Sequence, residues 1–202
     1  MRVTVWSDYC CPWCYLALDR LDVLDELDVA VDLLPFELHP EIPPDGRRHP
    51  PDGRTAAAFA RVAAECAEAG LPFSPPDATP NTAMVLSVAE AVRRTTPDAF
   101  PALHRRLFRA RFVDGVDLGD RGTVEALATE AGADADRVRR WRADGRAEAA
   151  VAEARTAAVD AGVTATPAFR FDTGLVVTGA HPRASLARWV TRMLARSETA
   201  PG

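Results

Sequence analysis

Two cysteines with two residues between them, in the order Cys11-Pro12-Trp13-Cys14, follow the first apolar segment of the chain. On a helix this spacing is close to one turn, so the two sulfurs can meet. Pro12 is typical of the first helical residue, which puts Cys11 at the N-cap, where unpaired N–H groups and the helix dipole favour a thiolate. The pattern therefore predicts thiol–disulfide exchange, with Cys11 as attacking thiol and Cys14, on the apolar side, as buried resolving thiol.

A structural zinc site is the main alternative for this motif, but it usually needs four ligands. A second Cys-x-x-Cys pair is absent, and the four histidines are scattered: His39, His49, His104 and His181. We therefore expect no metal and no cofactor. The other two cysteines, Cys10 and Cys66, are expected to be buried and inert, although a regulatory thiol remains an alternative for each.

Thr166-Pro167 is the second candidate site, directly before a short apolar run. A proline at the start of a strand is ordinary. The alternative is a cis Thr166–Pro167 bond that turns the backbone outward beside the active site; about 5–6% of X-Pro bonds in folded proteins are cis. Pro12, Trp13 and Thr166 are uncharged. All three are nevertheless expected to tune the redox potential of the Cys11–Cys14 pair.

The elements expected around these residues form a strand–helix–strand unit, a helical block and a strand–strand–helix unit. Alternation over residues 2–7 predicts a strand, and apolar spacing from residue 12 predicts an amphipathic helix. A second strand is expected at about 29–38, followed by a proline-rich loop. The later predictions are helices at 55–69, 82–95, 98–112, 120–131, 134–143 and 146–161, strands at 168–171 and 175–178, and a helix at 183–196.

This order predicts an α/β protein of thioredoxin-like fold with an inserted all-helical subdomain. Crossover rules make the first two strands parallel and the late hairpin antiparallel. We expect residues 1–45 and 160–202 to form the thioredoxin-like domain and residues 46–159 to form the insertion.

Composition limits the partners. The chain has 202 residues with a formal net charge of -5, and its 24 basic residues, all arginine, form no basic stripe. Nucleic acid and membrane are therefore not expected as partners. The first six residues do not have the pattern of a secretion signal, so a cytoplasmic location is expected.

The chain resembles the DsbA-like thioredoxin-fold oxidoreductases, most closely their FrnE-like branch. The matching segments run in the family's order along nearly the whole chain: 7–8, 11–15, 35–38, 81–82, 107–112, 115–118, 166–169 and 177–180. The resemblance implies disulfide exchange through Cys11 and Cys14 and a cis bond at Pro167. It also implies that Thr166 and Pro167 bind an extended substrate segment through the Thr166 backbone.

Three functions remain open on the sequence alone. The first is disulfide exchange with protein or small-molecule thiols and disulfides, glutathione included. The second is a glutathione-dependent isomerase or transferase, although such enzymes typically have serine in place of Cys11. The third is a non-catalytic peptide-binding or chaperone module with an exposed apolar groove around Trp13 and Pro167.

Overall fold

A mixed four-stranded sheet carries the cysteine motif at one end of its first strand. The computed structural model describes residues 1–50 and 54–199. The strand order is β2-β1-β5-β6, with β1 at Arg2–Ser7, β2 at Ala30–Pro35, β5 at Ala168–Phe171 and β6 at Val176–Thr178. Strand β1 pairs in parallel with β2 and antiparallel with β5, and β5 pairs antiparallel with β6. The predicted strand directions are confirmed.

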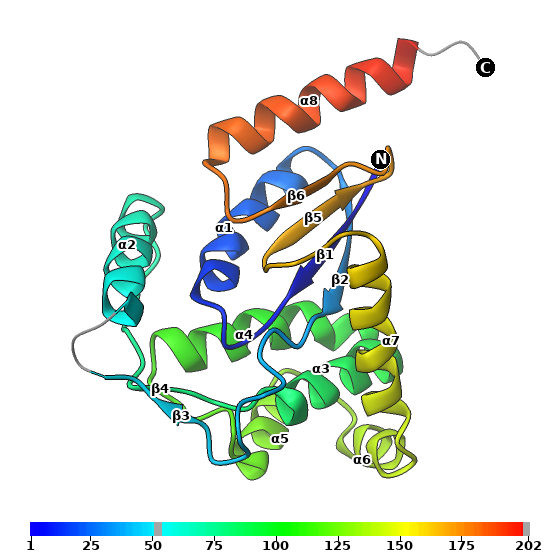
Figure 1. The fold of residues 1–202 in the computed structure, drawn as a ribbon. Coiled ribbons are helices and arrows are strands. Elements are labelled where there is room, and N and C mark those ends of the chain that lie inside the picture. Colours follow the sequence, from blue (N-terminus) through cyan, green and yellow to red (C-terminus); the bar gives the residue numbers. More distant parts are fainter. Residues whose placement is uncertain (51–53, 200–202) are drawn as a thin grey trace.

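Alternation along β1 sends side chains to the two faces of the sheet, as a period of two requires. Val3 and Val5 pack against α1 (Pro12–Glu26) and α8 (Arg183–Thr199) through Leu24 and Leu186. Trp6 points to the opposite face and packs near Ala158 of α7 (Arg146–Asp160). The sheet is thus covered on both faces, with α1 and α8 on one side and α7 on the other (Figure 1).

Of the remaining helices, all but the first gather at one end of the sheet; the first lies apart from them, alongside α1 (Figure 1). They are α2 (Arg54–Glu68), α3 (Ala83–Thr95), α4 (Phe100–Phe112), α5 (Arg121–Glu130) and α6 (Ala135–Ala143), with a 3-10 turn at Pro97–Ala99 before α4. The starts of α5 and α6 are capped by Asp120 and Asp134, whose carboxylates accept the N–H of Thr123 and Arg137. Each such cap typically stabilises its helix by about 1 kcal/mol.

The helical region shares one core with the motif. Cys11, Cys14 and Leu16 pack in the same buried cluster as Leu86, Leu107 and Phe108. The thioredoxin-like fold with helices inserted between β2 and β5 is therefore as predicted, while the residue boundaries 45/46 and 159/160 stay a prediction. A feature that the sequence did not indicate is a small second sheet, in which β3 (Arg47–Arg48) in the proline-rich loop pairs with β4 (Ala78–Thr79).

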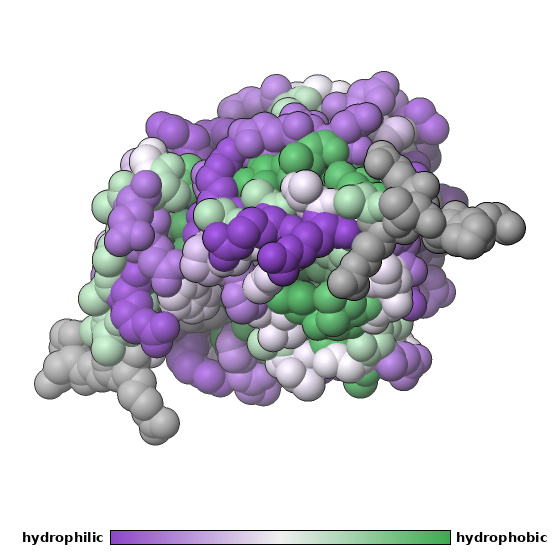
Figure 2. All heavy atoms as spheres, turned by 90° about the horizontal axis from the view of Figure 1, so that it is seen from above, coloured by the Kyte–Doolittle hydropathy of each residue, from purple (hydrophilic) through white to green (hydrophobic). Residues whose placement is uncertain are grey.

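The outer side of α8 forms a hydrophilic band with hydrophobic side chains visible on both flanks (Figure 2). Among the described residues, none of the helices has the length and apolar character needed to cross a bilayer.

Candidate active site at the start of the first helix

The loop after β1 delivers Cys11 to the N-cap of α1. Cys11 has extended backbone angles, φ -86° and ψ 114°, and Pro12 is the first helical residue. The Cys11 carbonyl accepts the N–H of Cys14 at 3.0 Å, and the Cys11 N–H donates to the Asp8 carbonyl at 3.1 Å. The position predicted for Cys11 is thus observed. Cys11 and Cys14 are only 4% and 2% exposed, so a reacting group must approach them from one restricted side.

The two thiols have opposite pKa shifts. The pKa of Cys11 is lowered, chiefly because the Cys14 thiol can donate a hydrogen bond to its thiolate, with Thr166 and the Cys14 N–H adding to the effect against the cost of burial. The pKa of Cys14 is raised well above its usual value, because burial and the neighbouring Cys11 disfavour a second charge. All four cysteines are free thiols. One poised and one protonated sulfur is the arrangement that stepwise disulfide exchange needs.

Thr166 and Pro167 lie beside the cysteine pair, across 155 residues of sequence. The Thr166–Pro167 peptide bond is cis. The Cys11 thiol donates a hydrogen bond to the Thr166 carbonyl at 3.3 Å. The Thr166 hydroxyl is buried and has no hydrogen-bond partner of normal geometry among the described residues, yet it lies close enough to both sulfurs to lower their pKa values. It is therefore free to donate to a thiolate once one forms.

A groove of about 950 Å³ opens next to these residues. Trp13 and Thr166 line its inner end, and it continues between α1 and α2 toward the start of α8 at Pro182 and Arg183. The Arg61 guanidinium carbon lies 5.7 Å from the centroid of the Trp13 ring. The sequence suggested an apolar groove around Trp13 and Pro167. Instead Pro167 is buried, and the groove carries charged residues of both signs, because Arg61, Glu65 and Glu68 of α2 line it while Val62 and Cys66 of the same helix pack into the core.

Cys10 and Cys66 are buried, as expected. The pKa of Cys10 is raised by burial and by the charge of Asp8. Burial also raises the pKa of Cys66, to about 11. Neither thiol is therefore ionised near neutrality. In the described part of the chain, no three His, Cys, Asp or Glu side chains come together as a metal site would require.

Asp8 is the site residue that motif reasoning did not single out. Its carboxylate is fully buried and accepts hydrogen bonds from the Leu38 N–H at 2.7 Å, the Thr82 hydroxyl at 3.1 Å and the Cys10 N–H at 3.3 Å. Burial raises the pKa of Asp8, and its charge in turn raises that of Cys11. The available signal was an acidic residue between an apolar strand and the cysteines, a place where burial requires polar partners.

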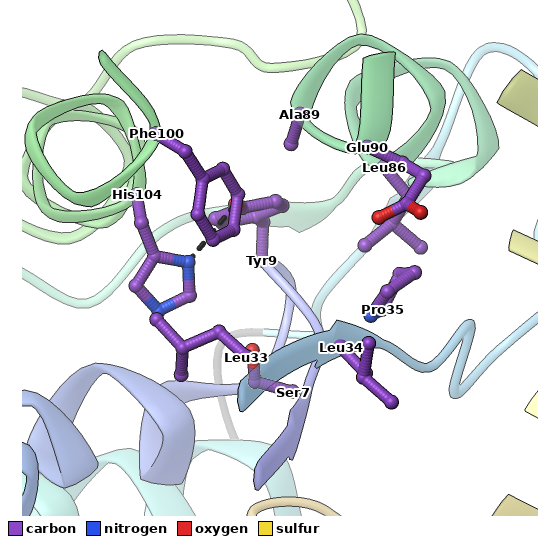
Figure 3. Close-up of a pocket in the computed structure, with 10 residues that line it drawn as sticks. All are labelled: Ser7, Tyr9, Leu33, Leu34, Pro35, Leu86, Ala89, Glu90, Phe100 and His104. Atoms are coloured by element: carbon purple, nitrogen blue, oxygen red, sulfur yellow. Dashed lines mark hydrogen bonds between the residues drawn. The ribbon is translucent and has the colours of Figure 1, made fainter. Parts of the chain in front are cut away.

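A small cavity lies between β1 and β2 on one side and α3 and α4 on the other. Its volume is about 10 Å³, roughly the space that one water molecule needs. At the edge of this cavity the Tyr9 hydroxyl and His104 Nδ1 form a hydrogen bond (Figure 3), with 3.0 Å between the two atoms. Burial lowers the pKa of His104 to about 3, so its ring is neutral. Tyr9 lies two residues before Cys11, and this bond helps fix the loop that carries the motif.

These features define a thioredoxin fold with a helical insertion, a Cys-x-x-Cys pair at the first strand-to-helix junction and a cis-proline segment opposite. The chain belongs to the DSBA-like thioredoxin domain family, whose model matches residues 2–190. No curated protein matches the chain.

Solved structures extend this comparison. A probable DsbA oxidoreductase from Streptomyces coelicolor is 27% identical with a TM-score of 0.83, covering 100% of this chain and 92% of that one. The cytosolic disulfide reductase DsbM from Pseudomonas aeruginosa, solved with GSH, has 18% identity and a TM-score of 0.70, with 96% and 100% covered. A 2-hydroxychromene-2-carboxylate isomerase has 17% identity and a TM-score of 0.78, with 100% of both chains covered. The last two establish similarity of fold.

Proposed function

We propose that this protein is a thiol–disulfide oxidoreductase in which Cys11 attacks and Cys14 resolves. The observation that carries the proposal is the pair itself: the Cys11 sulfur lies at the start of α1 with a lowered pKa, and a buried protonated thiol lies one helical turn away. Membership of the DSBA-like family and the similarity to a probable DsbA oxidoreductase support the same class of reaction.

The proposed reaction has two exchanges. The Cys11 thiolate attacks one sulfur of a substrate disulfide; the substrate S–S bond breaks, and the leaving sulfur departs as a thiolate that takes a proton. Cys14 then loses its proton and attacks the Cys11 sulfur, which releases the second substrate sulfur and forms the Cys11–Cys14 disulfide. The substrate gains two electrons and two protons. The same steps in reverse oxidise a substrate dithiol.

The groove beside Trp13 and Thr166 is the proposed entry for the substrate, and the Thr166 backbone is its proposed docking edge. Pro12, Trp13 and Thr166 are proposed to tune the redox potential, since all three adjoin the sulfurs. The substrates are protein or small-molecule thiols and disulfides, with glutathione among the thiols, in line with the DsbM structure solved with GSH. The ordered motif matches favour the FrnE-like branch, and we propose a cytoplasmic location.

Reduction of insulin disulfides by dithiothreitol tests the proposal. We expect the native protein to accelerate precipitation of the insulin B chain and Cys11→Ser to abolish the acceleration. Cys66→Ala is the matched control, because it also removes a buried cysteine thiol but lies outside the pair; it should keep the native rate. A Cys11→Ser protein as active as the native one would refute the proposal.

A second candidate is a glutathione-dependent isomerase or transferase. The observations in its favour are the wide groove beside the cis-proline segment and the similarity of fold to 2-hydroxychromene-2-carboxylate isomerase. Such an enzyme needs no resolving thiol. Glutathione-dependent isomerisation that survives in Cys14→Ser would favour this candidate, whereas loss of all activity in Cys14→Ser would favour disulfide exchange.

The third candidate, a peptide-binding or chaperone module without catalysis, requires no cycling thiols. Counting free thiols after treatment with oxidised and then reduced glutathione separates it from an oxidoreductase. Reversible loss of two thiols per chain, absent in Cys11→Ser, would exclude the module.

A further inference from the structure

The groove beside the cysteine pair has one wall whose charges form no ion pairs. That wall is the side of α2 carrying Arg61, Glu65 and Glu68, all of which line the groove. Among the described residues no ion pair involves any of the three, although Arg61 and Glu65 are separated by one helical turn. Arginine preceding glutamate at this spacing is the less favourable order for a pair within a helix. The Arg61 guanidinium lies against the Trp13 ring, and in the described part of the chain none of the three charges is paired with an opposite one.

The opposite wall is already neutralised. Asp19 of α1 pairs with Arg20 at 2.6 Å and with Arg183 at 3.0 Å. Arg183 also pairs with Glu26, and the Arg20 Nε donates to the His181 carbonyl at 2.9 Å. A ligand in the groove would gain little by competing for these groups, so α2 supplies the charges able to select among ligands.

The α2 charges change sign with distance from the sulfurs. Arg61 lies over Trp13, within the active-site motif, whereas Glu65 and Glu68 follow one and two turns further along the helix. Seven residues of helix rise about 10 Å. An extended polypeptide advances about 3.3 Å per residue, so this distance corresponds to about three substrate residues.

We infer that α2 selects polypeptide substrates by their charge pattern, an inference that rests on the proposed disulfide exchange at Cys11. Arg61 receives an acidic side chain next to the reacting cysteine. Glu65 and Glu68 receive a basic side chain about three residues further along the extended segment. The groove of about 950 Å³ lies at the upper end of the size range of small-molecule sites, and its unpaired charges are spread over two turns of α2, so an extended polypeptide can reach both of its ends.

Two synthetic peptides test the inference. Each has one cysteine in disulfide linkage to 2-mercaptoethanol. In the matched peptide, glutamate flanks the cysteine on both sides and arginine lies three residues beyond each glutamate; in the swapped peptide the two residue types are exchanged. Because each peptide is symmetric about its cysteine, it presents the same charge pattern whichever way its chain runs along the groove. The measurement is the rate at which fully reduced protein reduces each peptide, divided by the rate with free dithiothreitol, which corrects for the reactivity of the peptide disulfide itself.

We expect the native protein to prefer the matched peptide about tenfold at low salt, from two exposed charge contacts that change sign. The preference should shrink at 0.5 M salt because exposed charges are screened. The variant Arg61→Glu/Glu65→Arg/Glu68→Arg should prefer the swapped peptide. The control Arg121→Glu/Glu130→Arg reverses two exposed charges on α5 and should keep the native preference.

Equal corrected rates for the two peptides, or a preference that survives reversal of the α2 charges, would overturn the inference. The triple variant should lose more turnover with the matched peptide than with oxidised glutathione. Equal losses with the two substrates would also overturn the inference, because the α2 wall would then recognise a small disulfide as well as a polypeptide. Bis(2-hydroxyethyl) disulfide is uncharged, so its rate with each protein is the reference by which that protein's peptide rates are divided. If the native protein fails to reduce even this compound, the proposed function fails, which is distinct from a failure of charge selection.

Discussion

Acid should destabilise this protein through one buried histidine, and the size of the effect follows from the structure. His104 is neutral when folded, with a pKa lowered by burial to about 3, whereas an unfolded histidine titrates near 6.5. The unfolded chain therefore binds the extra proton first, and stability falls as pH drops below 6.5. Between pH 7.5 and pH 5.0 this single group should remove about 2 kcal/mol from the free energy of unfolding.

The perturbation that isolates this effect is His104→Asn, which cannot titrate but keeps an amide near the position of Nδ1 to meet the Tyr9 hydroxyl. Because asparagine is smaller than histidine, the variant should have a lower free energy of unfolding than the native protein, and this loss should be similar at every pH. Urea unfolding with a reductant present, followed by circular dichroism at pH 7.5, 6.5 and 5.0, gives the free energies. The native protein should lose about 2 kcal/mol more than the variant over this range. Parallel pH profiles for the two proteins would refute the reasoning and show that the imidazole is protonated in the fold.

Three further predictions concern the site. Cys14→Ser should stop after the first exchange, so intact-mass spectrometry should find a persistent mixed disulfide on Cys11; rapid release of product would contradict the resolving role. Thr166→Val should raise the pKa of Cys11, because it removes a hydroxyl that favours the thiolate, and an unchanged alkylation profile would argue against this role. Asp8→Asn should lower the pKa of Cys11 by removing a negative charge, and should destabilise the fold by about 1–3 kcal/mol because the amide cannot accept all three of the carboxylate's hydrogen bonds. Thiolate absorbance measures the change in the pKa of Cys11 in Asp8→Asn, and urea unfolding measures its loss of stability.

Local sequence signals were enough to predict most of the fold. Proline at helix position one set the start of α1, and glycines with φ of 93° and 84° at Gly132 and Gly162 ended two helices where the sequence indicated. The paired β3 and β4 strands were missed, because two residues per strand produce no periodicity and a proline-rich segment reads as a loop.

The site was only partly predictable, because several of its residues are held by contacts with parts of the chain that are distant in sequence. The spacing of Cys11 and Cys14 predicted their positions, whereas Asp8 gained its role from partners 30 and 74 residues away. The sequence indicated the unpaired N–H groups and the dipole at the helix start as causes of a lowered Cys11 pKa. The main cause in the structure is instead the Cys14 thiol, and burial opposes it. The charged groove wall depends on how α2 packs beside α1, which no local pattern encodes.

The most direct test of the central claim is the ionisation of Cys11 in the reduced protein. Absorbance at 240 nm, which reports thiolates, is measured against pH for the native protein and for Cys11→Ser, and the difference isolates this sulfur. The structure predicts a step below the ordinary cysteine value of about 8.5. A step at or above that value would contradict the assignment of Cys11 as a poised nucleophile.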